Sequence, residues 1–232
     1  MYHLTGVTTR ERSGRDPVRA LDGIDLYVED GGALVVRGAA GAGKSTLLRV
    51  LGGLERPSRG SVELDGTDLA TLTECRLARI RTESIGTVPN GGGLAPGCTA
   101  RQNVASALIP LRLLPADRWE LAGEALWEVG VDGRSDLPAA ELGASARQRV
   151  ALARALVKRP TVLLADRPTA GLAGAGRKEI IELFVRLWGE RRLTCVVATD
   201  DAELARRAPR LATMSDGRVA SIGRYPSAAT GG

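Results

Sequence analysis

A glycine-rich stretch that ends in lysine, serine and threonine is the strongest chemical signal in the chain. Glycine has no Cβ, so the backbone can wrap around a phosphate with several N–H groups pointing inward at the start of a helix. The Lys44 ammonium would then reach the β- and γ-phosphates of a nucleotide, and the Ser45 hydroxyl would ligate Mg²⁺. A chance glycine-rich turn is the alternative. The pattern favours a nucleotide phosphate site formed by Gly38, Gly41, Ala42, Gly43, Lys44, Ser45 and Thr46.

A carboxylate follows a second apolar run. Residues 162–165 are all apolar, and Asp166 comes directly after them. A buried strand that ends in an acid beside a phosphate loop places the carboxylate where the water shell of a bound Mg²⁺ needs an anchor. Many strands end in aspartate. This signal therefore gains its weight from the phosphate loop, which precedes it in the sequence at a separation that fits a single domain.

Short apolar runs alternate with helical patterns around these two motifs. Because strands that alternate with helices build a parallel sheet, the pattern predicts an α/β fold whose central sheet positions the phosphate loop. Strands are expected over 2–8, 24–28, 34–36, 62–64, 85–88, 162–165 and 194–198, helices over 44–51, 73–81 and 175–188, and a closing hairpin over 211–219.

The middle of the chain has a different pattern. Between residues 91 and 150 no strand is indicated, whereas helical spacing recurs over 101–108, 116–129 and 146–157. We predict one domain over 1–232, in which a helical subdomain at 91–150 interrupts a core formed by 1–90 and 151–223. Residues 224–232 are mostly small and polar, and we expect them to form a flexible tail.

Composition limits the classes of protein that remain. The chain has 232 residues, a net charge of +5, 44% hydrophobic and 25% charged residues, which suits a folded domain and excludes a disordered or fibrous protein. Of the 32 cationic residues three are lysines, and acids stand beside most of the arginines. The charge therefore indicates a solvated surface, with nucleic-acid binding as the disfavoured alternative.

Three cysteines without CxxC spacing and one histidine favour neither a disulfide framework nor a zinc site. The first ten residues lack the apolar core of a signal peptide, and no run approaches the roughly 18 to 20 apolar residues that cross a bilayer. We therefore expect a cytoplasmic protein whose contact with a membrane comes through a partner.

With these residues the chain resembles the ATP-binding-cassette (ABC) ATPase subunits over about residues 2–223, especially those of the macrolide-exporter and lipoprotein-release type. The resemblance implies a P-loop NTPase fold, with a RecA-like parallel core, an antiparallel β subdomain and an inserted helical subdomain. It also implies ATP and Mg²⁺ as cofactors, a head-to-tail dimer with a second cassette, a transmembrane partner subunit and a place on the cytoplasmic face of the membrane. The stretches that carry it are 20–24, the phosphate loop through 48, 52–57, 76–86, 99–104 and 147–156.

Several residues depart from the family pattern at the catalytic positions. Arg167 stands where the resemblance implies the glutamate that polarises the attacking water, and a guanidinium cannot accept a proton. Asp200 stands where the resemblance implies the switch histidine, and a carboxylate offers the γ-phosphate no hydrogen-bond donor. Asn90 replaces the glutamine that senses Mg²⁺ and reports to the membrane partner, and it is one methylene shorter. Of the implied metal set Ser45, Asp166 and Asn90, the last therefore has less reach.

The signature motif, which the resemblance places across the dimer from the partner's nucleotide, is altered too. In place of serine and two glycines the chain has Gly143, Ala144 and Ser145, and two of these put side chains into the approach of the phosphate. The aspartate of the dimer loop is Ala173. The aromatic residue expected to stack on adenine falls near Glu11.

These losses favour a subunit that binds Mg-ATP and does not hydrolyse it. A positioned general base contributes roughly 10² to 10⁴ to a rate, and one charge-stabilising donor about 10² to 10³. Two alternatives stay open. One is an active ATPase that powers export or extraction, and the other is a scaffold or regulator that keeps the fold to occupy a docking surface on a membrane protein.

Two further expectations concern the local structure around the site. Arg167 and Asp200 exchange the charges of the residues they replace, so we predict an ion pair between them that closes or half-neutralises the γ-phosphate pocket. The three glycines at 91–93 lie where such cassettes receive the coupling helix of the membrane partner, and they predict a looser loop there.

Overall fold

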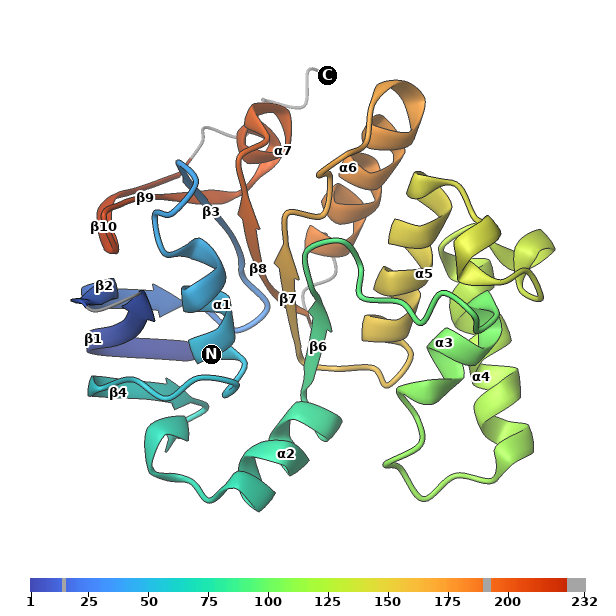
Figure 1. Ribbon diagram of the computed structural model, residues 1–232, viewed down its shortest axis with the longest axis horizontal. Coiled ribbons are helices and arrows are strands. Elements are labelled where there is room, and N and C mark those ends of the chain that lie inside the picture. The colour runs from blue at the N-terminus through green and yellow to red at the C-terminus, as the bar shows by residue number, and fades with distance from the viewer. Residues whose placement is uncertain (14–15, 190–192, 225–232) are drawn as a thin grey trace.

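A six-stranded sheet forms the centre of the fold, in a computed structural model that describes residues 1–13, 16–189 and 193–224. Five strands of this sheet run parallel in the order β9, β3, β8, β7, β6, and the sixth, β10, is antiparallel to β9 at the edge (Figure 1). The predicted α/β fold with a parallel core is confirmed. The strands are β3 (Ala33–Gly38), β6 (Ile85–Val88), β7 (Val162–Asp166), β8 (Thr194–Thr199), β9 (Arg210–Ser215) and β10 (Arg218–Arg224).

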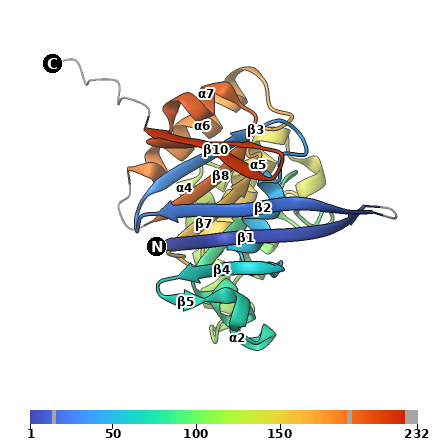
Figure 2. The same ribbon diagram turned by 90° about the vertical axis from the view of Figure 1, so that its left-hand side faces the viewer.

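A second, antiparallel sheet confirms the predicted β subdomain. It consists of β1 (Tyr2–Ser13), β2 (Asp16–Val28), β4 (Arg59–Leu64) and β5 (Thr67–Asp68), in the order β2, β1, β4, β5. The first two strands are longer than predicted and project beyond the rest of the sheet (Figure 2). The apolar alternation stops after Val7, whereas backbone pairing continues from Arg10 opposite Arg19 to Ser13 opposite Asp16. Hydrophobic patterning could not reveal this extension.

The helices are α1 (Lys44–Leu51), α2 (Glu74–Glu83), α3 (Ala100–Ser106), α4 (Pro115–Glu128), α5 (Ala144–Leu156), α6 (Gly174–Trp188) and α7 (Ala202–Arg207). Short 3₁₀ turns lie at Leu69–Thr71, Asp132–Arg134 and Ala139–Glu141. Residues 91–150 contain no strand, as predicted. Helix α7 is not predicted from the sequence, because six residues with two buried side chains are too short to show a period.

The central sheet separates two apolar layers. Along β3 the buried side chains alternate, so that Leu34 and Val36 join the layer with α1, while Val35 joins the layer with α3 to α6. Successive side chains of a strand point to opposite faces, so a strand with buried residues throughout is covered on both sides. Helix α1 lies between the two sheets (Figure 1). The loop from β3 to α1 is thereby fixed at both of its ends.

Candidate functional site

The glycine-rich loop joins the carboxyl end of β3 to the first turn of α1. Gly41 and Gly43 have positive φ angles of 81° and 91°, a region that L side chains rarely adopt. A Cβ on Gly43 would also come within 2.3 Å of the carbonyl oxygen of Ala20. Within the described ranges no side chain caps the N-terminus of α1. The N–H groups of its first turn are therefore available to an anion, as the sequence predicts.

Lys44 lies inside this loop. Its Nζ donates to the carbonyl oxygens of Gly38 at 2.8 Å and Ala39 at 2.7 Å, and the residue is 7% exposed. Burial lowers the pKa of the Lys44 ammonium, while the Asp200 carboxylate opposes this shift, the Arg167 guanidinium adds to it, and the Asp166 carboxylate opposes it. Asp200, Arg167 and Asp166 therefore all lie near enough to Lys44 for their charges to act on its ammonium group.

The sheet brings the predicted metal residues to the same edge. Asp166 ends β7, and Asn90 follows β6, whose Val88 pairs with Ala165. Ser45, in the first turn of α1, and Asn90 are exposed. One oxygen of Asp166, Oδ1, is buried and has no hydrogen-bond partner among the described residues. An orphaned carboxylate oxygen suits a Mg²⁺ ion or its water shell.

The predicted ion pair between Arg167 and Asp200 is confirmed. Nη2 of Arg167 donates to Oδ2 of Asp200 at 2.8 Å. The backbone N–H of Arg167 donates to the carbonyl of Ala198 at 2.8 Å, which ties the residue to β8 just before Asp200. Arg167 also has a positive φ of 48°, an uncommon backbone state for a residue with a side chain. The neighbouring strands thus hold the two charged residues face to face.

The signature residues lie apart from the phosphate loop. They stand at the N-terminus of α5, which packs against α3, α4 and α6, whereas α1 lies on the other side of the central sheet (Figure 1). Gly143 and Ala144 are exposed, but the hydroxyl of Ser145 is buried. A Cβ on Gly176 of α6 would meet the Cβ of Ser145 at 3.0 Å. The Ser145 hydroxyl therefore faces the protein rather than solvent, and Ala144 is the more exposed of the two added side chains.

The other two substituted positions are only partly described. Ala173 is exposed and precedes α6 as its N-cap. The side chain of Glu11 lies outside those that the structure describes.

The glycine loop after β6 is held more firmly than its composition predicts. Arg154 of α5 donates through Nη1 to the carbonyl of Gly93 and through Nη2 to that of Gly92, both at 2.6 Å. Gly91, Gly92 and Gly93 all have positive φ angles, so the glycines serve the shape of the turn. These hydrogen bonds from a partly buried guanidinium to two of the three carbonyls argue against the expected looseness.

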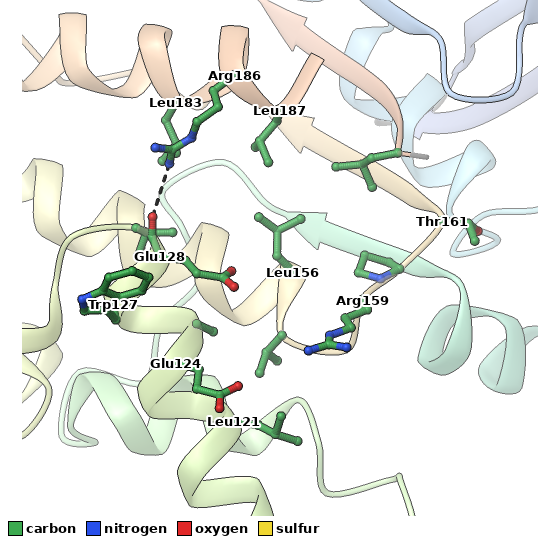
Figure 3. A pocket seen from close by; sticks show the side chains of 15 residues that line it. Leu121, Glu124, Trp127, Glu128, Leu156, Arg159, Thr161, Leu183, Arg186 and Leu187 are labelled. Carbon is green, nitrogen blue, oxygen red and sulfur yellow. Dashed lines mark hydrogen bonds between the residues drawn. The ribbon is translucent and has the colours of Figure 1, made fainter. Parts of the chain in front are cut away.

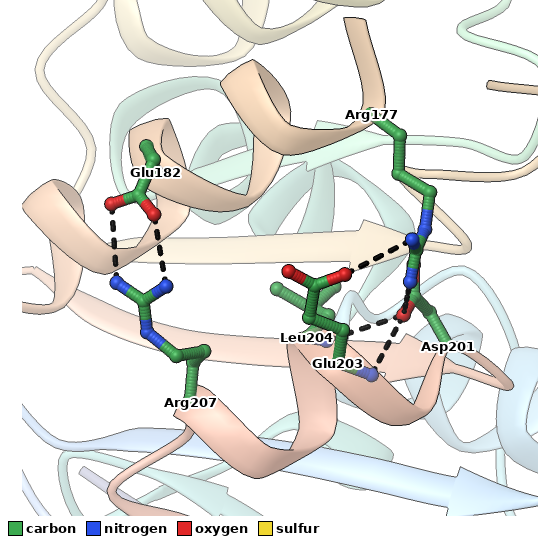
Figure 4. Close-up of polar contacts among 6 residues, drawn as sticks. All are labelled: Arg177, Glu182, Asp201, Glu203, Leu204 and Arg207. Carbon is green, nitrogen blue, oxygen red and sulfur yellow. Dashed lines mark hydrogen bonds and ion pairs between the residues drawn. The ribbon is translucent and has the colours of Figure 1, made fainter. Parts of the chain in front are cut away.

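A network centred on Asp201 was not predicted from the sequence. Its carboxylate accepts from Nε of Arg177 at 2.8 Å and from Nη2 at 2.6 Å, and it caps α7 by accepting from the N–H groups of Glu203 and Leu204 (Figure 4). Arg177 also pairs with the Glu203 carboxylate at 3.0 Å. The only hint in the sequence is an aspartate one residue before a short helix. This network anchors the residue next to Asp200 to the first turn of α6.

Asp201→Asn is expected to weaken the acid sensitivity of folding. Hydrogen bonds from Arg177 hold the pKa of Asp201 far below its usual range, and those from Thr169, Leu204 and Glu203 add to the effect. A depressed pKa stabilises the folded state above the pKa of the unfolded chain, about 3.9, and this contribution is lost as the pH falls through the folded value. The variant should unfold a few degrees lower at pH 7 and lose less further stability between pH 5 and pH 3.

Thermal unfolding followed by circular dichroism at several pH values measures this effect. Asp136→Asn, at an exposed aspartate, is the matched control. Equal pH dependence in wild type and Asp201→Asn would contradict the role given to the carboxylate.

A separate groove of about 780 Å³ lies at the opposite edge of the sheet (Figure 3). Pro160 and Thr161, just before β7, and Leu193, just before β8, line its floor, together with residues of α4, α5 and α6. Nη2 of Arg186 donates to the carbonyl of Glu128 across it at 3.2 Å. Because the phosphate loop follows the carboxyl end of its strand, this groove at the amino ends is no part of the nucleotide site.

Comparison with known proteins agrees with this geometry. A family model described as ABC transporter matches residues 21–170. The lipoprotein-releasing system ATP-binding protein LolD of Geobacter metallireducens is 40% identical over 219 residues, which cover 94% of this chain and 97% of that protein. The macrolide export ATP-binding/permease protein MacB of Rhodopirellula baltica is 39% identical over 95% of this chain. The chain spans only 32% of the length of that MacB protein.

Solved structures show the same fold. A dimeric post-hydrolysis structure of the ATP-binding cassette MJ0796 bound to ADP and Pi matches with a TM-score of 0.91 and 32% identity, and the match covers 98% of this chain and 100% of that one. A second dimeric structure of MJ0796 matches with a TM-score of 0.90 and 31% identity. The chain belongs to the ABC transporter family and has the fold of its ATP-binding cassettes.

Proposed function

We propose that the chain is the ATP-binding subunit of an ABC transporter complex, and that it binds Mg-ATP without hydrolysing it. The observation that carries the second part is the 2.8 Å ion pair between Arg167 and Asp200. It occupies the two positions where the family resemblance implies a general base and a switch histidine. A guanidinium takes no proton from water, and a carboxylate donates no hydrogen bond to a phosphate. Position 167 therefore lacks the proton acceptor, and position 200 lacks the hydrogen-bond donor, that the family resemblance implies there.

The geometry around the phosphate loop, by contrast, supports the proposal that the chain binds Mg-ATP. The loop with its left-handed glycines, the open N-terminus of α1 and the Lys44 ammonium form a cradle for phosphate groups. Ser45 and Asp166 would hold Mg²⁺, with Asn90 at the edge of the site, and the ion would neutralise charge on the phosphates when bound. The unpartnered Oδ1 of Asp166 supports this assignment.

The partners follow from the family rather than from contacts of this chain. The two MJ0796 structures are dimeric. LolD is named as the ATP-binding protein of a lipoprotein-releasing system, and MacB is named as a protein that is both ATP-binding and a permease. In the described ranges no helix is both long and apolar enough to cross a membrane. We propose a second cassette and a transmembrane subunit as partners, with the chain peripheral on the cytoplasmic face. Ala144 at the signature would weaken contact with the partner's nucleotide.

Two assays on the purified chain test this function. Calorimetric titration with ATP in the presence of Mg²⁺ should show saturable binding, and a phosphate-release assay at the same concentrations should show no turnover above a chain-free blank. Binding with steady release would favour the active ATPase. No binding of either ATP or ADP would favour the scaffold.

A further inference from the structure

The guanidinium of Arg167 has N–H donors that the described part of the chain does not use. One hydrogen bond joins its Nη2 to Oδ2 of Asp200, and its Nε is buried without a partner among the residues that the structure describes. Arg177 differs, because it engages both oxygens of Asp201 through two nitrogens and pairs with Glu203 as well. A guanidinium carries five donors in a rigid fork that suits two oxygens of a phosphate. Arg167 is therefore only partly satisfied by Asp200.

The sheet places Arg167 within reach of the phosphate loop. Strand β8 lies between β3, which leads into the loop, and β7, which ends just before Arg167. Thr199 pairs with Arg37 and Ala198 with Asp166, so the three strands end at the same level. Two strand intervals correspond to about 10 Å, which an arginine side chain and a triphosphate can bridge together. The effect of Arg167 on the Lys44 ammonium agrees with this proximity.

The pair between Arg167 and Asp200 is open to water. The side chain of Arg167 is 41% exposed and that of Asp200 is 55% exposed. Ion pairs at exposed positions add little to stability, whereas a phosphate dianion offers a guanidinium more charge and more acceptors than one carboxylate does. The contact can therefore be exchanged when a ligand arrives.

We infer that Arg167 binds the terminal phosphate of a nucleoside triphosphate, and that this contact makes the site prefer ATP over ADP. In the free chain Asp200 holds the guanidinium beside the loop. In the complex the guanidinium donates to the phosphate, whether or not its hydrogen bond to Asp200 persists. This inference rests on the proposed function, since it requires that nucleotide binds at the loop, and it assigns Arg167 a role in recognition in place of the lost base.

A double-mutant cycle tests the contact. The affinities for Mg-ATP and Mg-ADP are measured by titration calorimetry in wild type, Arg167→Gln, Asp200→Asn and the double variant, at one ionic strength. In the Asp200→Asn background no carboxylate repels the phosphate, so the further change Arg167→Gln isolates the contact with the ligand. We expect this change to weaken ATP binding about 10-fold or more and ADP binding less than about 3-fold.

The alternative is a pair that stays closed over the site, with Arg167 serving only to neutralise Asp200. In that case Arg167→Gln has no effect on ATP binding once Asp200 is asparagine, and the inference is wrong. Equal losses for ATP and ADP would also overturn it. Arg112→Gln, at an exposed arginine before α4, controls for the change in net charge. A wild-type chain that binds neither nucleotide would refute the proposed function as well, whereas an unselective site would refute this inference alone.

Discussion

The double replacement Arg167→Glu and Asp200→His is expected to raise the steady-state rate of ATP hydrolysis by about 100-fold or more. Glutamate directly after β7 supplies a carboxylate that accepts a proton from water, and histidine after β8 supplies a donor to the γ-phosphate. The strands that hold these positions face each other already, because the present side chains meet at 2.8 Å. Ala144 remains at the signature, and it keeps the expected gain near the lower end of the range.

The gain is measured as phosphate release at saturating Mg-ATP. Each single replacement should give a smaller gain, since base and donor act on the same transition state and their effects do not simply add. Adding Lys44→Met to the double variant should abolish the new activity. If titration shows that the double variant is saturated with ATP at the assay concentration and it still releases no phosphate, positions 167 and 200 are not what limits the present chain.

Lys44→Met is expected to lower the affinity for Mg-ATP by about 100-fold. Loss of the ammonium removes charge-assisted hydrogen bonds to two phosphates, each worth about 1.5 to 3 kcal/mol. Methionine keeps an apolar stem in a position that is 7% exposed, so the loop loses its cation with little change in packing. The hydrogen bonds of Nζ to the carbonyls of Gly38 and Ala39 are lost as well, which alters the free loop.

Titration calorimetry measures this change. The exposed Lys178 of α6 provides the matched control, and Lys178→Met should bind Mg-ATP as wild type does. Thermal unfolding of both variants shows whether the fold is kept. Unchanged affinity in Lys44→Met would place the nucleotide somewhere other than this loop.

The phosphate loop and the sheet around it could be predicted because their signals are local. The glycines, Lys44 and the apolar run before Asp166 each stand within a few residues of the elements they define. The pair of Arg167 with Asp200 could also be predicted, although 33 residues separate them, because the family resemblance puts both positions at one site. Its geometry then follows from the adjacent ends of β7 and β8.

Contacts between distant helices could not be predicted in the same way. Arg177 and Asp201 lie on different elements, and nothing in either segment selects this partner among the many charged residues. Arg154 reaches the glycine loop 61 residues earlier in the chain, which makes that loop firmer than its composition indicates. The inward turn of Ser145 depends on Gly176 of α6, which leaves room for it. Each of these features is set by tertiary packing.

The most direct test of the whole account is the fate of the bound nucleotide. Purified chain is incubated with radiolabelled ATP and Mg²⁺ at a protein concentration above that of the nucleotide, quenched over several hours, and the nucleotides are separated by chromatography. We expect titration to show that the ATP is bound, and we expect the rate at which labelled ATP is converted to ADP to be no higher than in the chain-free blank. Mg²⁺-dependent conversion of the bound ATP to ADP within minutes, lost in Lys44→Met, would contradict this account.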